Sequence, residues 1–159
     1  MKLFPIFLIL GAGIALASGR QFERCELARI LHNRYGFPRN QLADWICLVE
    51  WESSFRTNAV GPPNSDGSRD WGLFQINDRY WCKSSNYRNS HNMCGVSCEH
   101  LLSDDITTAV NCVRKIYAAH GFSGWNAWTQ HCHSPSSVDH CFVDADCLSG
   151  GVSFAKGWL

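Results

Sequence analysis

Apolar residues recur at helical spacing in two stretches near the start of the chain. Residues 23–35 have one apolar face and are followed by Gly36, so the pattern predicts a helix that ends there. Residues 41–53 have an apolar stripe and further apolar residues outside it, which predicts a helix buried nearly all round. The first face consists of Leu27, Ile30 and Leu31. The second helix has the stripe Leu42, Trp45, Ile46 and Val49, with Cys47, Leu48 and Trp51 outside it.

Two more helices are predicted in the second half of the chain. Ser103 is positioned to cap a helix over residues 104–119, whose first two acidic residues suit the positive end of the helix dipole. Gly121 ends this helix, and a short helix is expected over 125–131. The buried stripe of the longer helix consists of Ile106, Ala109, Val110, Val113 and Tyr117.

The pattern between these helices is typical of a small sheet followed by a loop. Residues 61–68 are dense in turn formers and lead into the apolar run 71–76, which predicts a small hairpin. Residues 81–99 are polar and contain three cysteines, as in irregular loops that disulfides hold. The order of elements predicts an α+β fold of two lobes, mostly helical with a small antiparallel sheet.

The start of the chain has a different pattern. One basic residue precedes an apolar run over 3–16, and small residues follow up to Gly19, which is typical of a secretory signal peptide cleaved there. A membrane anchor is the alternative, but the run is shorter than the ~20 residues that span a bilayer. We therefore expect a secreted, extracellular protein with a signal peptide over 1–19, one domain over 20–141 and a loosely ordered extension over 142–159.

Secretion changes the interpretation of the nine cysteines, because oxidising compartments let disulfides persist. Eight can form four bridges in roughly a hundred ways, and Cys147 is left over. A zinc site at Cys94 and Cys98 with His91 and His100 is an alternative, but no second close pair completes four ligands, so no metal and no cofactor are expected. The eight are Cys25, Cys47, Cys82, Cys94, Cys98, Cys112, Cys132 and Cys141.

The charge balance argues against nucleic acid as a partner. The chain has 14 basic and 14 acidic residues, and loss of the leader would remove only Lys2, which leaves a net charge of −1 with neutral histidines. Protonation of all seven histidines would bring the net charge to +6. Mild acidification would therefore reverse the sign of the surface charge.

Glu52 and Asp70 are the candidate catalytic residues. Glu52 lies in the predicted buried helix, where loss of hydration raises the pKa of a carboxyl group, whereas Asp70 follows a polar turn that can keep it ionised. A protonated acid beside a carboxylate is what glycoside cleavage requires. The pattern alone does not single out this pair, because Glu50 shares the helix and Asp66 shares the turn.

Seven motifs together carry a family resemblance. They are RCELA at 24–28, WESSF at 51–55, DGSRDWGLFQIN at 66–77, YWC at 80–82, LLSDDIT at 101–107, VNC at 110–112 and WNAW at 125–128. With these motifs and eight cysteines in order, residues 20–141 resemble a chicken-type (c-type) lysozyme of the kind found in insects. The expected fold is then lysozyme-like, with four disulfides.

The resemblance implies a glycosidase that cleaves β-1,4 links between N-acetylmuramic acid and N-acetylglucosamine in bacterial peptidoglycan, in antibacterial defence or digestion. Glu52 would be the general acid and Asp70 the nucleophile or charge stabiliser of a retaining mechanism, for which lysozyme is itself the type case, with carboxyl groups about 5 to 5.5 Å apart. The implied bridges are Cys25–Cys141, Cys47–Cys132, Cys82–Cys98 and Cys94–Cys112.

Six further residues match the family's sugar-binding positions. Trp125 matches the tryptophan beside the acid, and Tyr80 and Trp81 match a stacking platform, although each is also a candidate core aromatic. The polar positions are Asn64, Gln75 and Asn77. The turn before Asp70 carries an additional residue, so the register of Asn64 is open.

The chain also departs from familiar members. The loop over 118–124 is shorter and lacks an acidic sugar contact, which leaves the outer subsites open. Ser103, Thr108 and Ala109 stand where some relatives have calcium ligands, so no calcium is expected. The extension after Cys141 is an addition, and Cys147 would be a free thiol on a monomer or link a dimer.

Fold does not determine function, so the alternative is a non-catalytic carbohydrate-binding or modulatory protein on the same fold. Retention of both acids favours the enzyme. The weak net charge provides little attraction to anionic walls at neutral pH, which favours a digestive role in acidic fluid.

Overall fold

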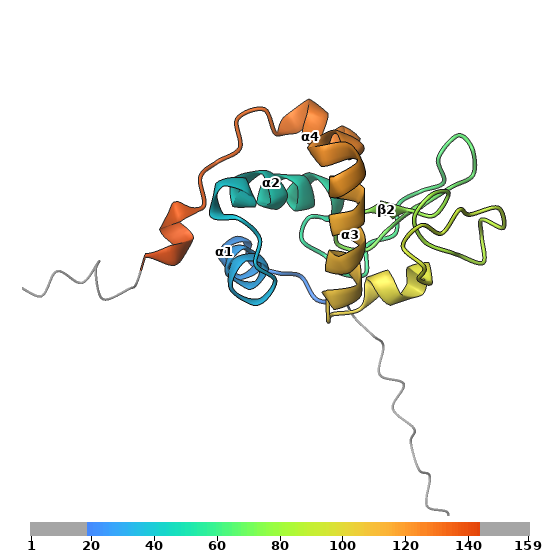
Figure 1. The fold of residues 1–159 in the computed structure, drawn as a ribbon, viewed down its shortest axis with the longest axis horizontal. Helices are drawn as coiled ribbons and strands as arrows, with labels where there is room; N and C mark the ends of the chain where they lie inside the picture. Colours follow the sequence, from blue (N-terminus) through green and yellow to red (C-terminus); the bar gives the residue numbers. More distant parts are fainter. Residues whose placement is uncertain (1–18, 144–159) are drawn as a thin grey trace, which may run out of the picture.

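The structure, a computed structural model, describes residues 19–143. The proposed signal peptide up to residue 18, the extension from residue 144 and Cys147 lie outside the described residues. Figure 1 shows α3 standing between the helices α1 and α2 on one side and the strands with their long loops on the other. The helices are α1 (Arg24–Arg29), α2 (Leu42–Ser53), α3 (Thr107–His120) and α4 (Asn126–His131), and the strands are β1 (Asp70–Trp71) and β2 (Ile76–Asn77).

The helices lie close to their predicted positions but differ at their ends. The first begins as α1 and continues as a π-helix over Ile30–Arg34, and Gly36 ends it with φ +69°. A 3₁₀ turn over Arg39–Gln41 precedes α2, and another over Gly121–Gly124 joins α3 to α4.

The predicted start of α3 is wrong by three residues. Ser103 does not cap this helix, because its hydroxyl accepts the N–H of Asp105 at 3.1 Å. The Asp105 carboxylate in turn accepts the N–H of Thr107, the first residue of α3, at 3.0 Å. Asp104 lies outside the helix and accepts the N–H of Arg20 at 2.7 Å. Asp104, which was predicted to lie in the first turn of the helix, therefore contacts the N-terminal segment instead.

The hairpin forms within the apolar run itself. β1 and β2 pair antiparallel, with Asp70 opposite Asn77 and Trp71 opposite Ile76. The chain reverses at Gly72, where φ is +73° and a Cβ would collide with the carbonyl oxygen of Leu101. This position therefore requires glycine.

A buried carboxylate stabilises the base of the hairpin. Asp78 has no exposed surface and accepts the backbone N–H of Arg69 at 2.8 Å, the indole N–H of Trp71 at 3.2 Å and the hydroxyl of Ser84 at 2.7 Å. Three donors satisfy a group that would otherwise be costly to bury.

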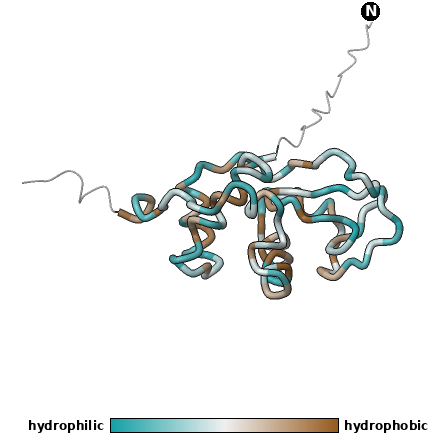
Figure 2. The backbone as a smooth tube through the Cα atoms, turned by 90° about the horizontal axis from the view of Figure 1, so that it is seen from above, coloured by the Kyte–Doolittle hydropathy of each residue, from teal (hydrophilic) through white to brown (hydrophobic). Residues whose placement is uncertain are grey.

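Trp45 joins the two parts of the core. Its ring from α2 lies 6.1 Å from that of Phe74 in the hairpin, 5.4 Å from Tyr117 of α3 and 5.6 Å from Trp125 before α4. In Figure 2 the hydrophobic stretches gather toward the middle of the molecule, and the loops at its edge are mostly hydrophilic. One continuous core therefore underlies both lobes.

Four disulfides cross-link the chain: Cys25–Cys141, Cys47–Cys132, Cys82–Cys98 and Cys94–Cys112. Two of them take up Cys94 and Cys98, so the alternative of a zinc site at these thiols is wrong. Within residues 19–143, none of the helices has the length and apolar character needed to cross a membrane.

Candidate active site

A cleft of ≈ 520 Å³ lies between the C-terminal end of α2, the hairpin and the start of α4. Both candidate acids and all six predicted sugar-binding residues line it: Glu52, Asp70, Asn64, Gln75, Asn77, Tyr80, Trp81 and Trp125. Residues that are up to 73 positions apart in the sequence therefore share one cavity. Its size is typical of a site for a small molecule or for part of a polymer.

Glu52 occupies the last turn of α2, which ends where Ser54 adopts the left-handed conformation. Its side chain is half-buried, and the pKa of Glu52 is raised from 4.5 to about 7. Loss of hydration is the larger cause, and the negative charge of Asp70 adds to it, whereas the N–H of Ala127 opposes both. This carboxyl group can therefore hold a proton close to neutral pH.

Asp70 begins β1, and two amide groups bind its carboxylate. Asn77, its partner on β2, donates to Oδ1 at 2.8 Å, and Asn64 donates to Oδ2 at 3.1 Å. These two bonds hold both carboxylate oxygens of Asp70 in place. The turn residue Asn64, whose register the sequence left open, therefore contacts the second acid directly.

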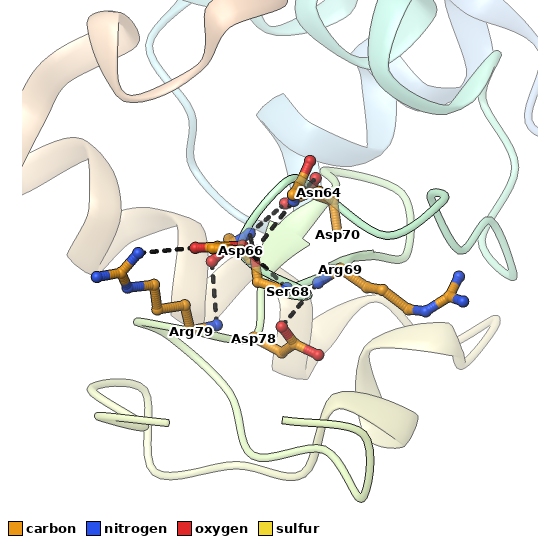
Figure 3. A network of polar contacts seen from close by, with 8 residues as sticks. Asn64, Asp66, Ser68, Arg69, Asp70, Asp78 and Arg79 are labelled. Atoms are coloured by element: carbon orange, nitrogen blue, oxygen red, sulfur yellow. Dashed lines mark hydrogen bonds and ion pairs between the residues drawn. The ribbon is translucent and has the colours of Figure 1, made fainter. Parts of the chain in front are cut away.

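A further layer of polar groups orients these amides (Figure 3). The buried hydroxyl of Ser68 donates to Asp66 at 2.6 Å and accepts from Asn64 at 3.2 Å and Asn77 at 3.1 Å. The Oδ1 atom of Asn77 accepts the backbone N–H of Arg79 at 3.0 Å, which turns its NH₂ group toward Asp70.

Asp66 anchors this layer as a carboxylate. It accepts the Ser68 hydroxyl and N–H, and the Arg79 guanidinium donates to it at 2.7 Å. These bonds lower the pKa of Asp66 to about 2. Arg69 is adjacent to Asp70 in the sequence but points away from it in Figure 3, and its guanidinium binds the carbonyl of Gly61 at 2.9 Å.

The cleft aromatics differ in exposure. Trp125 is only 4% exposed, and its indole N–H donates to the carbonyl of Phe74 at 2.9 Å, so it belongs to both the core and the cleft wall. Trp81 is buried at 8% exposure, whereas Tyr80 is 42% exposed. The amide of Gln75 donates to the carbonyl of Gly72 at 2.8 Å and so stabilises the hairpin turn.

Trp51 and His131 also line the cleft, although neither is among the residues that the sequence predicts there. The prediction that Trp51 is buried is wrong, because its side chain is 56% exposed and stacks on His131 with ring centroids 3.9 Å apart. Trp51 follows Val49 by two residues and therefore lies off the apolar stripe of α2. An aromatic residue off the stripe and next to Glu52 was the signal that could have identified it.

Comparison with known proteins shows similarity to a single family over most of the chain. The family model for the C-type lysozyme/alpha-lactalbumin family matches residues 20–141. "Lysozyme P" of Drosophila melanogaster is 46% identical over 89% of this chain and 100% of its own length. "Lysozyme 1" of Musca domestica is 47% identical over 86% and 98% of the two chains, and "Lysozyme" of Galleria mellonella is 50% identical over 76% and 97%.

Proposed function

This chain belongs to the C-type lysozyme/alpha-lactalbumin family, and from that premise we propose that it cleaves β-1,4 links between N-acetylmuramic acid and N-acetylglucosamine in bacterial peptidoglycan. Its relatives at 46–50% identity are lysozymes, so its enzyme class is lysozyme. One observation carries the finer proposal. Glu52 has a pKa of about 7, and Asp70, in the same cleft, receives two amide hydrogen bonds.

In the proposed mechanism Glu52 donates its proton to the glycosidic oxygen, and the bond from that oxygen to the anomeric carbon breaks. The carboxylate of Asp70 faces the resulting oxocarbenium carbon and either bonds to it or stabilises its charge. Glu52, now a carboxylate, takes a proton from water while the water oxygen attacks the anomeric carbon, and any bond between that carbon and Asp70 breaks to return the Asp70 carboxylate. The sugar is released with its original configuration, and Glu52 is protonated again.

The surrounding residues support the roles of the two acids. Asn64 and Asn77 stabilise the carboxylate of Asp70 by hydrogen bonds. Neither amide carries a full positive charge, which would bind the carboxylate too tightly. Tyr80 and Trp81 supply aromatic surface in the cleft for sugar rings, and Trp125 forms part of the apolar wall of the same cleft. A binding protein without catalysis has no need of a carboxyl group whose pKa is held near 7, which favours the enzyme over that alternative.

We also propose that the protein is secreted after cleavage behind Gly19 and acts as a monomer. Four disulfides suit an oxidising compartment outside the cell. We further propose a digestive role in acidic fluid. The near-neutral net charge and the protonation of Glu52 in mild acid support it.

The test is clearance of a peptidoglycan suspension between pH 4 and 8 by the wild type, Glu52→Gln and Asp70→Asn. We expect both variants to remain folded by circular dichroism and to lose at least 100-fold in rate, on the order of the effect of removing an acid catalyst. NMR of the first product should show retention. An inactive wild type, or folded variants with full activity, would overturn the proposal.

A further inference from the structure

Three aromatic side chains that line the cleft each contact a histidine ring. The Trp51 and His131 rings are stacked at 3.9 Å and 13°, and the Tyr80 and His91 rings are stacked at 5.9 Å and 8°. The rings of Trp81 and His120 meet edge to face at 5.9 Å and 82°. We call His91, His120 and His131 the rim histidines. All three are exposed, and they come from three separate parts of the chain.

We propose that the rim histidines determine substrate specificity by making the cleft prefer anionic over neutral glycans as the pH falls. This inference rests on the proposed function, because it concerns the same cleft and the same reaction. Muramic acid and the peptides attached to it carry carboxylates, so peptidoglycan is an anionic glycan. The histidines do not take part in bond cleavage.

The physical basis is the charge that imidazole gains on mild acidification. Histidine side chains become positive between about pH 8 and 5 in most proteins. A cation within ~6 Å of an aromatic ring is attracted to its face, so the two stacked histidines, His131 and His91, can stay at Trp51 and Tyr80 when protonated. The three positive charges then lie around the sugar-binding surface, where they attract substrate carboxylates.

The cleft has few carboxylates that could compensate a positive rim. Asp66 pairs with Arg79 at 2.7 Å, and the same guanidinium lies 5.2 Å from the ring of Tyr80, which His91 also contacts. Glu52 is next to Trp51, and its raised pKa keeps it largely neutral in mild acid. Asp70 is the remaining carboxylate among the residues that line the cleft. The positive rim therefore faces little compensating negative charge.

Position distinguishes the rim histidines from the rest. His100, His133 and His140 are also exposed, but none of them is in ring contact with the cleft residues Trp51, Tyr80 or Trp81. Substitution of either set by glutamine removes the same formal charge. The two sets therefore separate a local effect at the cleft from the effect of net charge.

The experiment compares two substrates with one glycan backbone: soluble peptidoglycan fragments, and the same fragments with their carboxylates converted to amides. The kcat/KM ratio of anionic to amidated substrate is measured at pH 5 and pH 7.5 in low salt. The enzymes are the wild type, the rim variant His91→Gln/His120→Gln/His131→Gln and the control variant His100→Gln/His133→Gln/His140→Gln. Titration of Glu52 affects both substrates alike and cancels in the ratio.

We expect the wild-type ratio to rise on the order of tenfold from pH 7.5 to pH 5 and to lose this rise at 0.2 M salt. The control variant should keep the rise, and the rim variant should lose it while still cleaving the amidated substrate. If the rim variant does not fold, the three single variants replace it, and each should lose part of the rise.

The inference would be overturned if the folded rim variant kept the wild-type rise of the ratio, or if the control variant lost that rise to the same extent. Either result would leave the proposed function intact. A wild type that cleaves neither substrate would overturn the proposed function as well. The two failures are therefore distinguishable.

Discussion

Glu52 destabilises the folded protein at neutral and alkaline pH, because its charged form is poorly hydrated in the cleft. The rise of its pKa from 4.5 to about 7 corresponds to roughly 3 kcal/mol between the two protonation states. The folded state binds the proton more tightly than the unfolded state, so stability falls as the pH rises from about 4.5 to about 7. The same desolvation that keeps Glu52 protonated close to neutral pH therefore lowers the free energy of unfolding once the group is ionised.

We expect Glu52→Gln to be more stable than the wild type at pH 8, by up to about 3 kcal/mol, and to differ little at pH 4. Glutamine cannot ionise and resembles the protonated acid in size, so it escapes the penalty. Urea denaturation at both pH values measures the difference. Glu50→Gln is the matched control, because Glu50 is exposed on the same helix. An equal gain in the control, or no gain at pH 8, would contradict the prediction.

At the scale of the element, the hairpin carries Asp70 and its partner Asn77 at the ends of two very short strands. Two-residue strands have little stability of their own, so the turn and the groups beneath it must hold their geometry. Gly72 in the turn and the buried Asp78 provide that support. The position of the Asp70 carboxylate is therefore sensitive to the turn.

Gly72→Ala should destabilise the protein by about 1 to 2 kcal/mol for the left-handed conformation and by about 1 to 3 kcal/mol more for the collision with Leu101. Gly67→Ala shares the positive φ, at +82°, but its Cβ would meet nothing within 4 Å. We expect Gly67→Ala to show only the first cost and to keep its activity. Urea denaturation and peptidoglycan clearance test both variants, and equal losses would refute the role of close packing.

At the scale of the whole molecule, local patterns predicted most of the helices, and the family motifs predicted eight cleft residues. Helical periodicity depends on neighbours in the sequence, which is why the stripe of α2 was found. Asp104, which was predicted to begin this helix, instead binds the backbone N–H of Arg20, 84 residues away, and no local pattern reports such a contact. The hydroxyl of Ser68 likewise acquires its role only when the hairpin brings Asn64 and Asn77 together.

The contact between Arg20 and Asp104 predicts that the fold is more stable in a chain that begins at Arg20. The backbone nitrogen of Arg20 lies 2.7 Å from Oδ1 of Asp104 and 2.9 Å from the hydroxyl of Thr57, which is fully buried. In a chain that begins at Arg20 this nitrogen is an ammonium group, and a charge-assisted hydrogen bond is stronger than one from a neutral amide. A chain that begins at Arg20 would therefore bind its N-terminal segment more tightly to the segment that precedes α3.

We expect a chain that begins at Arg20 to be more stable at pH 6 than one that begins at Gly19, by about 1 kcal/mol because the pair is exposed. Hydrogen bonds from Thr57 and Arg20 lower the pKa of Asp104, so its contribution is complete above the ordinary pKa of 3.8 and is lost as the pH falls below it. Thermal unfolding of both chains should therefore differ at pH 6, and the difference should shrink as the pH falls below 3.8. Asp104→Asn should abolish the difference at pH 6, and its persistence in that variant would show that the ammonium group acts through another residue.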